Sequence, residues 1–142
     1  MPFKYLPDVA IADIAFEATG KDLSRLFEAA ALAIADITAD TKTVQSKVKK
    51  QLKVQAESIE RLLYDFLTEL LVIKDAQGLI FNSFAIRVSA EQGRCSLEAI
   101  ARGDKIDYRK QNLRNDVKAI TMHMFAVKKV KAGWKATVVV DI

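Results

Sequence analysis

Residues 10–20 read AIADIAFEATG, and this stretch predicts a β-strand with one carboxylate, Asp13, in an apolar run. From Asp8 to Ala18, apolar and more polar positions alternate with the two-residue period of a β-strand that has two different faces. One face carries Ala12, Ile14, Phe16 and Ala18, and the other carries Ile11, Asp13, Ala15 and Glu17. An ionised aspartate is costly to bury unless it is paired or bound to a cation. Asp13 is therefore expected either to lie on an open strand face or to meet a positive partner.

A helix is expected directly after this strand. Gly20 ends the strand, and Lys21 or Asp22 opens a helix that continues to about residue 38. Its apolar residues recur at helical spacing: Leu23, Leu26, Phe27, Ala30, Ile34 and Ile37. The sequence ADTKT then forms a loop.

A second strand and a second helix are expected next, followed by a series of strands. The strand covers Val44–Ala56, and Ser58 is an N-cap candidate for the second helix, which Gly78 closes. The buried stripe of this helix is Ile59, Leu62, Leu63, Phe66, Leu67, Leu70 and Leu71. The strands that follow are expected at Leu79–Ser89, Arg94–Arg102, Val117–Val130 and Trp134–Ile142, with hairpin turns at Gln92–Gly93 and Ala132–Gly133.

These elements predict one α+β domain spanning residues 1–142. The order is β-α-β-α-β-β-β-β, and two helices combined with mostly antiparallel strands are typical of a two-layer sandwich. The polar segment from Asp104 to Asn115 is expected to leave the sheet as a loop. No internal repeat or linker is evident.

The composition favours a cytoplasmic location and excludes a membrane span. Hydrophobic residues make up 51% of the 142 positions, but no apolar run approaches the roughly 20 residues that a span requires. The net charge of +4 permits an RNA or phosphate partner without requiring one. Basic residues gather in KVKKQLK (47–53) and KKVKAGWK (128–135), where only Trp134 supplies an aromatic ring. We interpret both runs as solvated strand faces.

The chain offers little conventional catalytic chemistry. It has no phosphate loop or Rossmann glycine pattern, and one cysteine with one histidine cannot build a common zinc site. The single histidine, His123, lies in AITMHMFAV, which we expect to be a strand. A lone strand histidine is more often structural than catalytic.

The last residues, WKATVVVDI, suggest a partner for Asp13. If this strand lies beside the Asp13 strand, the carboxylates of Asp13, Asp141 and the Ile142 terminus converge. Such a group would repel itself without a cation, and oxygen ligands suit Ca²⁺ or Mg²⁺. The alternative is that Asp141 is simply part of a solvated chain end, and the residues alone favour it.

Four segments, in order, resemble the archease family over nearly the whole chain. They are YLPDVAIADIAFEATGKDLSRLFEAAALAIADI, SIERLLYDFLTELL, VKAITMHMF and VVVDI. The resemblance implies a small α+β protein that activates the RNA ligase of tRNA splicing. It implies promotion of the ligase's guanylylation and multiple turnover, and a relaxed nucleotide choice. The protein would be a cofactor of that ligase rather than an enzyme, with tRNA as an indirect partner.

The resemblance also implies a metal site, usually of calcium, at Asp13, Asp141 and the C-terminal Ile142, which reverses the preference for a solvated end. It assigns Lys118 to activation and places His123 in the same partner-contact segment. The chain departs from the family pattern in two places. Met122 and Met124 flank His123 in place of an aromatic and an acidic residue, and Val9–Ile11 replaces a threonine-rich entry.

A second class of function stays open at this point. The chain could be a small RNA-binding module, or a chaperone-like partner of tRNA-modifying enzymes such as a tRNA methyltransferase. An RNA-binding module would need a continuous basic face, ordinarily with stacking aromatics. A metal-dependent hydrolase is a more distant alternative, because no residue pattern selects a reaction.

Overall fold

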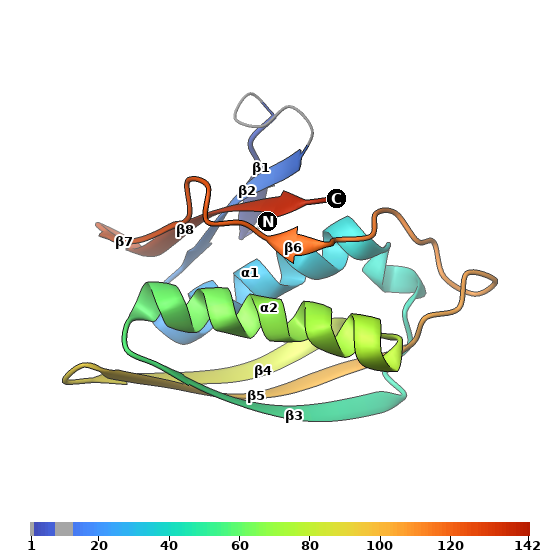
Figure 1. Ribbon diagram of the computed structural model, residues 1–142, viewed down its shortest axis with the longest axis horizontal. Helices are drawn as coiled ribbons and strands as arrows, with labels where there is room; N and C mark the ends of the chain where they lie inside the picture. The colour runs from blue at the N-terminus through green and yellow to red at the C-terminus, as the bar shows by residue number, and fades with distance from the viewer. Residues whose placement is uncertain (1, 8–12) are drawn as a thin grey trace.

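The computed structural model describes residues 2–7 and 13–142 and contains two helices between two antiparallel sheets (Figure 1). The elements are, in chain order, β1 (Phe3–Tyr5), β2 (Asp13–Gly20), α1 (Leu23–Thr38), the 3₁₀ turn η1 (Thr41–Thr43), β3 (Val48–Ala56), α2 (Ile59–Gln77), β4 (Leu79–Glu91), β5 (Arg94–Lys105), β6 (Ala119–Ile120), β7 (Ala126–Val130) and β8 (Gly133–Asp141).

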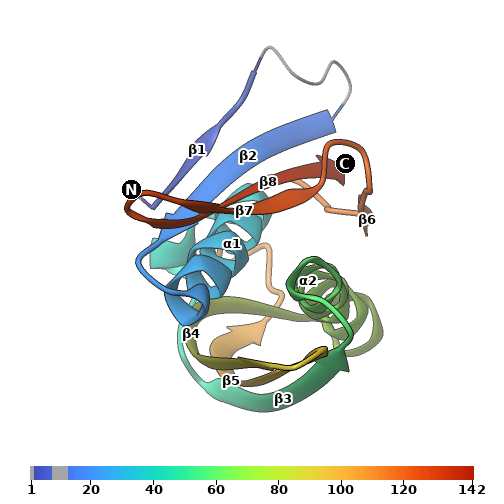
Figure 2. The ribbon, with the colours of Figure 1, turned by 90° about the vertical axis from the view of Figure 1, so that its left-hand side faces the viewer.

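The strands divide between the two sheets according to their place in the chain. One sheet has the order β1-β2-β8-β6, with β7 also paired to β8, and the other has the order β3-β5-β4. Figure 2 shows the helices lying between the two sheets. The α+β class with two helices and antiparallel strands is confirmed. The prediction of two layers did not foresee that the strands form two separate sheets. These two sheets cover the helices on both sides.

The composition of α1 explains why a helix can be covered on both sides. The sequence AAALAIA (29–35) buries side chains around most of the helix, rather than along one stripe. A helix that is apolar nearly all round needs neighbours on more than one face. α1 accordingly contacts β4 of one sheet and β2 of the other, and the stacked rings of Phe27 and Phe66 join it to α2.

The β2 strand follows the predicted alternation over its described residues. Phe16 and Ala18 are fully buried and Ile14 packs against the same core, whereas Asp13 and Glu17 occupy the other face. The part of the expected strand before Asp13 lies outside the described residues.

The predicted helix ends are confirmed. The Asp22 and Ser58 side chains accept hydrogen bonds from the backbone N–H groups of Arg25 (2.8 Å) and Arg61 (3.1 Å). Gly78 ends α2 in the left-handed conformation that favours glycine. The Gln92–Gly93 hairpin is also confirmed, while the other turn lies one residue earlier than expected, at Lys131–Ala132.

The prediction of one continuous strand over Val117–Val130 is wrong, and so is the placement of His123 in a strand. Ile120 pairs with Val140 and Ala126 with Thr137, so this segment has twice as many residue steps as the stretch of β8 beside it. The surplus residues form a turn in which the Phe125 N–H donates to the Met122 carbonyl (3.3 Å). His123 lies in this turn, and Met124 adopts a positive φ of 57°.

Two smaller differences concern β1 and the start of β3. β1 was not expected, because three residues carry too little pattern to identify a strand. β3 begins at Val48 rather than Val44, because Thr41–Thr43 form a 3₁₀ turn capped by the Asp40 side chain. None of the helices formed by the described residues has the length and apolar character needed to cross a bilayer.

Gly103 gives a direct test of the β4–β5 packing. A Cβ at this position would meet the Ile80 carbonyl oxygen and lie 2.6 Å from Phe81 Cα, at the irregularity in β4. We expect Gly103→Ala to lower the free energy of unfolding by about 1–3 kcal/mol, the usual range for overpacking. Urea denaturation measures this change. The exposed control Ser89→Ala should change stability by less than about 0.5 kcal/mol, and equal stability of both variants would contradict the packing.

Candidate functional site

The β2–β8 ladder places Asp13 directly opposite Asp141. Directly opposed residues of an antiparallel pair share one face, with Cβ atoms about 4.5–5.5 Å apart. Asp13 is half-buried and Asp141 is exposed. Ile142 follows at once, with its side chain packed against the core. The structure therefore brings together the two aspartates and the chain end.

Lys118 lies on the other side of the same strand end. Its backbone N–H donates to the Asp141 carbonyl (2.8 Å), and the next residue, Ala119, pairs with Asp141. The Lys118 side chain is exposed. The end of β8 is thus held between β2 and β6, and the backbone of Lys118 lies next to Asp141.

A buried lysine fixes the segment that leads to Lys118. Lys74 of α2 is only 7% exposed, and its ammonium donates to the Val117 carbonyl (2.7 Å) and to the Asp116 carboxylate (2.6 Å). A buried ammonium is costly unless it is paired and hydrogen-bonded. This contact therefore ties α2 to the entry of β6 and limits where Lys118 can lie.

His123 is not brought into this group. Thr121 donates to the Val139 carbonyl, so the turn that follows lies between the β8 positions Val139 and Thr137, two or more residues from the chain end. His123, Met122 and Met124 are all exposed on this turn. The site therefore separates the predicted activation residues into Lys118 at the chain end and His123 on a neighbouring turn.

The chemistry of the chain end fits a hard cation. Two carboxylates directly opposite each other destabilise a ladder, and no ion pair within residues 2–7 and 13–142 involves Asp13 or Asp141. The donors available at this end are carboxylate oxygens, which suit Ca²⁺. The described part of the chain contains no group of three or more His, Cys, Asp or Glu side chains that could hold a metal.

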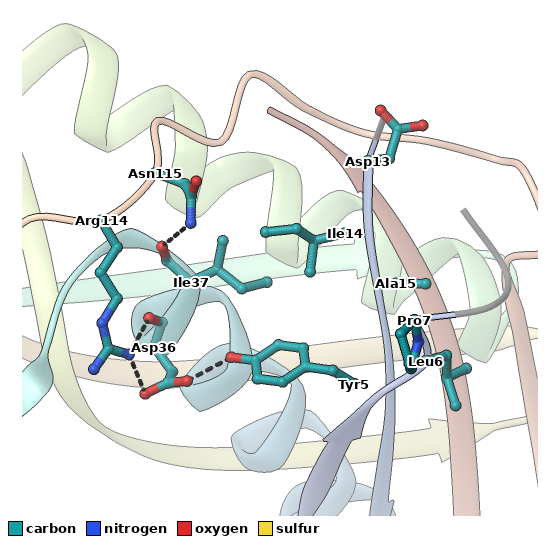
Figure 3. A pocket seen from close by; sticks show the side chains of 10 residues that line it. All are labelled: Tyr5, Leu6, Pro7, Asp13, Ile14, Ala15, Asp36, Ile37, Arg114 and Asn115. Carbon is teal, nitrogen blue, oxygen red and sulfur yellow. Dashed lines mark hydrogen bonds and ion pairs between the residues drawn. The ribbon is translucent and has the colours of Figure 1, made fainter. Parts of the chain in front are cut away.

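A cavity of about 380 Å³ that the sequence did not predict lies next to Asp13. In it, the Arg114 guanidinium donates to the carboxylate and to the backbone carbonyl of Asp36, both at 2.9 Å, and the Tyr5 hydroxyl donates to the same carboxylate. Figure 3 shows this group facing the cavity, while the Asp13 carboxylate points away from it. The three residues come from β1, α1 and the loop before β6, so no local pattern links them.

The Tyr5 phenol is held in its neutral form. Partial burial, followed by the hydrogen bond to Asp36 and the charge of Asp36, raises the pKa of Tyr5 above its usual value, although Arg114 opposes the shift. A phenolate at this position would lie against a carboxylate. The hydrogen bond from the uncharged Tyr5 phenol to Asp36 therefore joins β1 to the C-terminal end of α1.

Comparisons with known proteins agree with this architecture. The archease protein family matches residues 3–142. Protein archease of Pyrococcus abyssi is 39% identical over 132 residues, which cover 92% of this chain and 93% of the relative. Protein archease of Methanosarcina barkeri is 35% identical over 141 residues, covering 99% and 95% of the two chains.

Two solved structures share the fold. The solution structure of protein 1598 from Methanobacterium thermoautotrophicum superposes with a TM-score of 0.86, at 32% identity and 99% coverage of both chains. The crystal structure of an archease from Thermotoga maritima, described as a possible chaperone, has a TM-score of 0.63 at 20% identity, with 96% coverage of both chains. This chain is thus a small two-sheet α+β protein with paired carboxylates at its chain end. It belongs to the archease family.

The Tyr5–Asp36 contact predicts a pH dependence of stability. The unfolded chain releases the Tyr5 proton near pH 10, whereas the folded chain retains it, so the folded state binds more protons above that pH. The contribution of Tyr5 to stability is therefore complete below about pH 10 and falls as the pH rises further. We expect Tyr5→Phe to flatten the decline in the free energy of unfolding between about pH 9 and 11.

Urea denaturation of both proteins across this range makes the measurement. Tyr108→Phe serves as the control, because Tyr108 is an exposed tyrosine. If wild type, Tyr5→Phe and Tyr108→Phe show the same pH dependence, the Tyr5 proton is not held by the fold.

Proposed function

We propose that this protein activates the RNA ligase of tRNA splicing, as a protein cofactor that promotes guanylylation and multiple turnover of the ligase. The observation that carries the proposal is that Asp13, Asp141 and the backbone of Lys118 lie together at one end of the first sheet. Membership of the archease family supports it. An altered nucleotide choice of the ligase belongs to the same proposal.

The activator has to favour one state of the ligase over another, because a ligand shifts an equilibrium only through its differential affinity for the two states. In the proposed contact, the Lys118 ammonium meets a phosphate or an acidic side chain in the guanylylation-competent state of the ligase. Lys118 is suited to this role because its backbone is anchored to Asp141 while its side chain remains exposed. The Lys74 contact to Val117 keeps that anchor in place.

We further propose that Asp13, Asp141 and the terminal carboxylate of Ile142 hold a Ca²⁺ ion, with Mg²⁺ as the alternative. A bound cation would neutralise the repulsion between the opposed carboxylates and stiffen the strand end that carries Lys118. Asp13 and Asp141 supply ligands from adjacent strands of a fixed ladder. Both Asp13 and Asp141 remain accessible enough for an ion to reach them.

A second candidate is a chaperone-like role toward a tRNA-modifying enzyme such as a tRNA methyltransferase. The observation that favours it is the exposed turn carrying Met122 and Met124, whose side chains are 60% and 49% exposed. Methionine adapts to varied apolar surfaces. Protection of an aggregating methyltransferase by wild type, and its loss in Met122→Ser/Met124→Ser, would separate this role from ligase activation.

The ligase proposal is tested by multiple-turnover RNA ligation with the cognate ligase. We expect substoichiometric protein to raise turnover and to show no ligation alone. Lys118→Ala should reduce this activation at least tenfold while leaving the melting temperature unchanged, because exposed charges change stability little. Lys110→Ala is the matched control, since Lys110 is also exposed. Turnover that is unaffected by the wild-type protein would refute the proposal, and parallel loss of melting temperature and activity would make Lys118 a structural residue.

The metal proposal is tested by thermal melts with Ca²⁺ and with chelator. An ion that binds only the native state stabilises it by mass action, so wild type should melt higher with Ca²⁺. Residues added after Ile142 convert the terminal carboxylate into a neutral peptide carbonyl and remove one ligand charge, which weakens Ca²⁺ binding. The extended protein and Asp13→Ala should both lose most of the shift, whereas Glu91→Ala, an exposed control, should keep it. An equal shift in wild type and extended protein would exclude the terminal carboxylate as a ligand.

A further inference from the structure

On the outer side of the β3-β5-β4 sheet, four cations form a cluster that we call the basic face: Lys49, Lys53, Arg87 and Arg102. Arg94, which is also exposed on this side, lies outside the cluster, at the hairpin end of β5 and opposite Glu91. All four side chains are exposed, and they come from all three strands. The opposite face of the same strands, which faces the helices, carries buried residues such as Leu52, Phe84 and Leu97. The sequence run 47–53 suggested only a solvated strand face, because the two arginines are distant in sequence.

The register of the strands fixes how these cations are spaced. Lys49 lies directly opposite Arg102, and four residues further along, Lys53 and Arg87 lie on either side of Glu98. Strands are about 4.8 Å apart and rise about 3.3 Å per residue. The four cations therefore cover an area of about 10 by 13 Å.

Within residues 2–7 and 13–142, this positive charge is only partly neutralised. Glu98 is the single anion within the area, and within the described residues none of the four cations takes part in an ion pair. Like charges directly opposite each other, such as Lys49 and Arg102, destabilise a ladder. Glu98 lies opposite both Lys53 and Arg87 and stabilises the ladder at that point, but four cations against one anion leave an excess of positive charge. This excess makes the basic face complementary to a polyanion.

The shape and composition of the face select the kind of polyanion. A three-stranded sheet offers a broad surface, which includes a hollow of about 250 Å³ beside Arg87 and Glu98. The aromatic residues of these strands, Phe81 and Phe84, are buried, so no ring is available for base stacking. Binding of single strands usually depends on such stacking, whereas double-helical RNA is held largely through its backbone.

We propose that the basic face binds the phosphate backbone of an RNA stem. The choice of RNA over other polyanions rests on the proposed link to an RNA ligase, but the contact itself requires no ligase. The β3-β5-β4 sheet and the C-terminal end of β8 lie on opposite sides of the helices (Figures 1 and 2), and the basic face is on the outer side of that sheet. One protein can therefore hold an RNA stem while its chain end remains free for a protein partner.

The second basic run provides a matched control. Lys128 and Lys129 are exposed residues of β7, in the other sheet, and Lys129 lies over the Trp134 ring at 6.0 Å. Replacing them removes the same charge as replacing Lys53 and Arg87. If RNA binding depended only on net charge, both double variants would bind RNA equally weakly. If it depends on the basic face, only replacement of Lys53 and Arg87 weakens RNA binding.

The test is fluorescence anisotropy with a labelled RNA hairpin whose stem has about 16 base pairs, the length that one duplex-binding domain can span. Four phosphate contacts predict a slope of log affinity against log salt of about −3 to −4, or about a 100-fold loss between 50 and 200 mM salt. Lys53→Gln/Arg87→Gln should weaken binding at least tenfold at low salt and reduce the slope by about 2. Glu98→Gln should strengthen binding, and Lys128→Gln/Lys129→Gln should stay within twofold of wild type.

Circular dichroism establishes that each variant is folded before binding is measured. Absence of binding by wild type at low salt would overturn the proposal, and so would equal weakening of the two double variants. Poly-glutamate that binds as tightly as the hairpin, with the same sensitivity to the variants, would indicate an acidic protein partner instead. Because no ligase is present, failure here is distinct from failure of ligase activation.

Discussion

The antiparallel pairing of β2 with β8 holds the first sheet together and positions the candidate site. It joins the first long strand of the chain to the last, with Phe16 opposite Val138 and Asp13 opposite Asp141. A slip of one residue would turn every side chain of a strand to the opposite face. Burial of Phe16 and Val138 therefore fixes the register that places both aspartates together on the outer face.

The same pairing organises the strands around it. β2 carries β1 along one edge, and β8 carries β6 and β7 along the other, so the chain end is enclosed on both sides. Lys74 then connects this sheet to α2 through the Val117 carbonyl, and Arg114 connects the preceding loop to α1 through Asp36. The exposed Lys118 is thereby attached to a rigid frame, which the proposed recognition of one state of a ligase requires.

The sequence predicted best those features that depend on near neighbours. The alternation around Phe16, the caps at Asp22 and Ser58, and the left-handed Gly78 follow from local periodicity and backbone chemistry. The proximity of Asp13 and Asp141 also followed, on the single assumption that the first and last strands pair.

The features that the sequence did not predict depend on distant partners. The turn around His123 exists because β6 and β7 share one strand, β8, with a surplus of residues between them. Tyr5, Asp36 and Arg114 form one group only after three separate elements have packed. Arg87 and Arg102 join Lys49 and Lys53 only through sheet register, so a run that looked like a solvated edge belongs to a larger basic face.

The proposed cation site depends on the β2–β8 register, which sets the Asp13 and Asp141 carboxylates against each other as its ligands. Its most direct test is the free energy of unfolding of wild type and Asp13→Asn, measured by urea denaturation in chelator and in Ca²⁺. Without metal, removal of one charge should relieve repulsion and make Asp13→Asn the more stable protein. With Ca²⁺, loss of a ligand should make it the less stable one. If the difference in the free energy of unfolding between the two proteins has the same sign and size with chelator and with Ca²⁺, Asp13 is not a ligand of the ion.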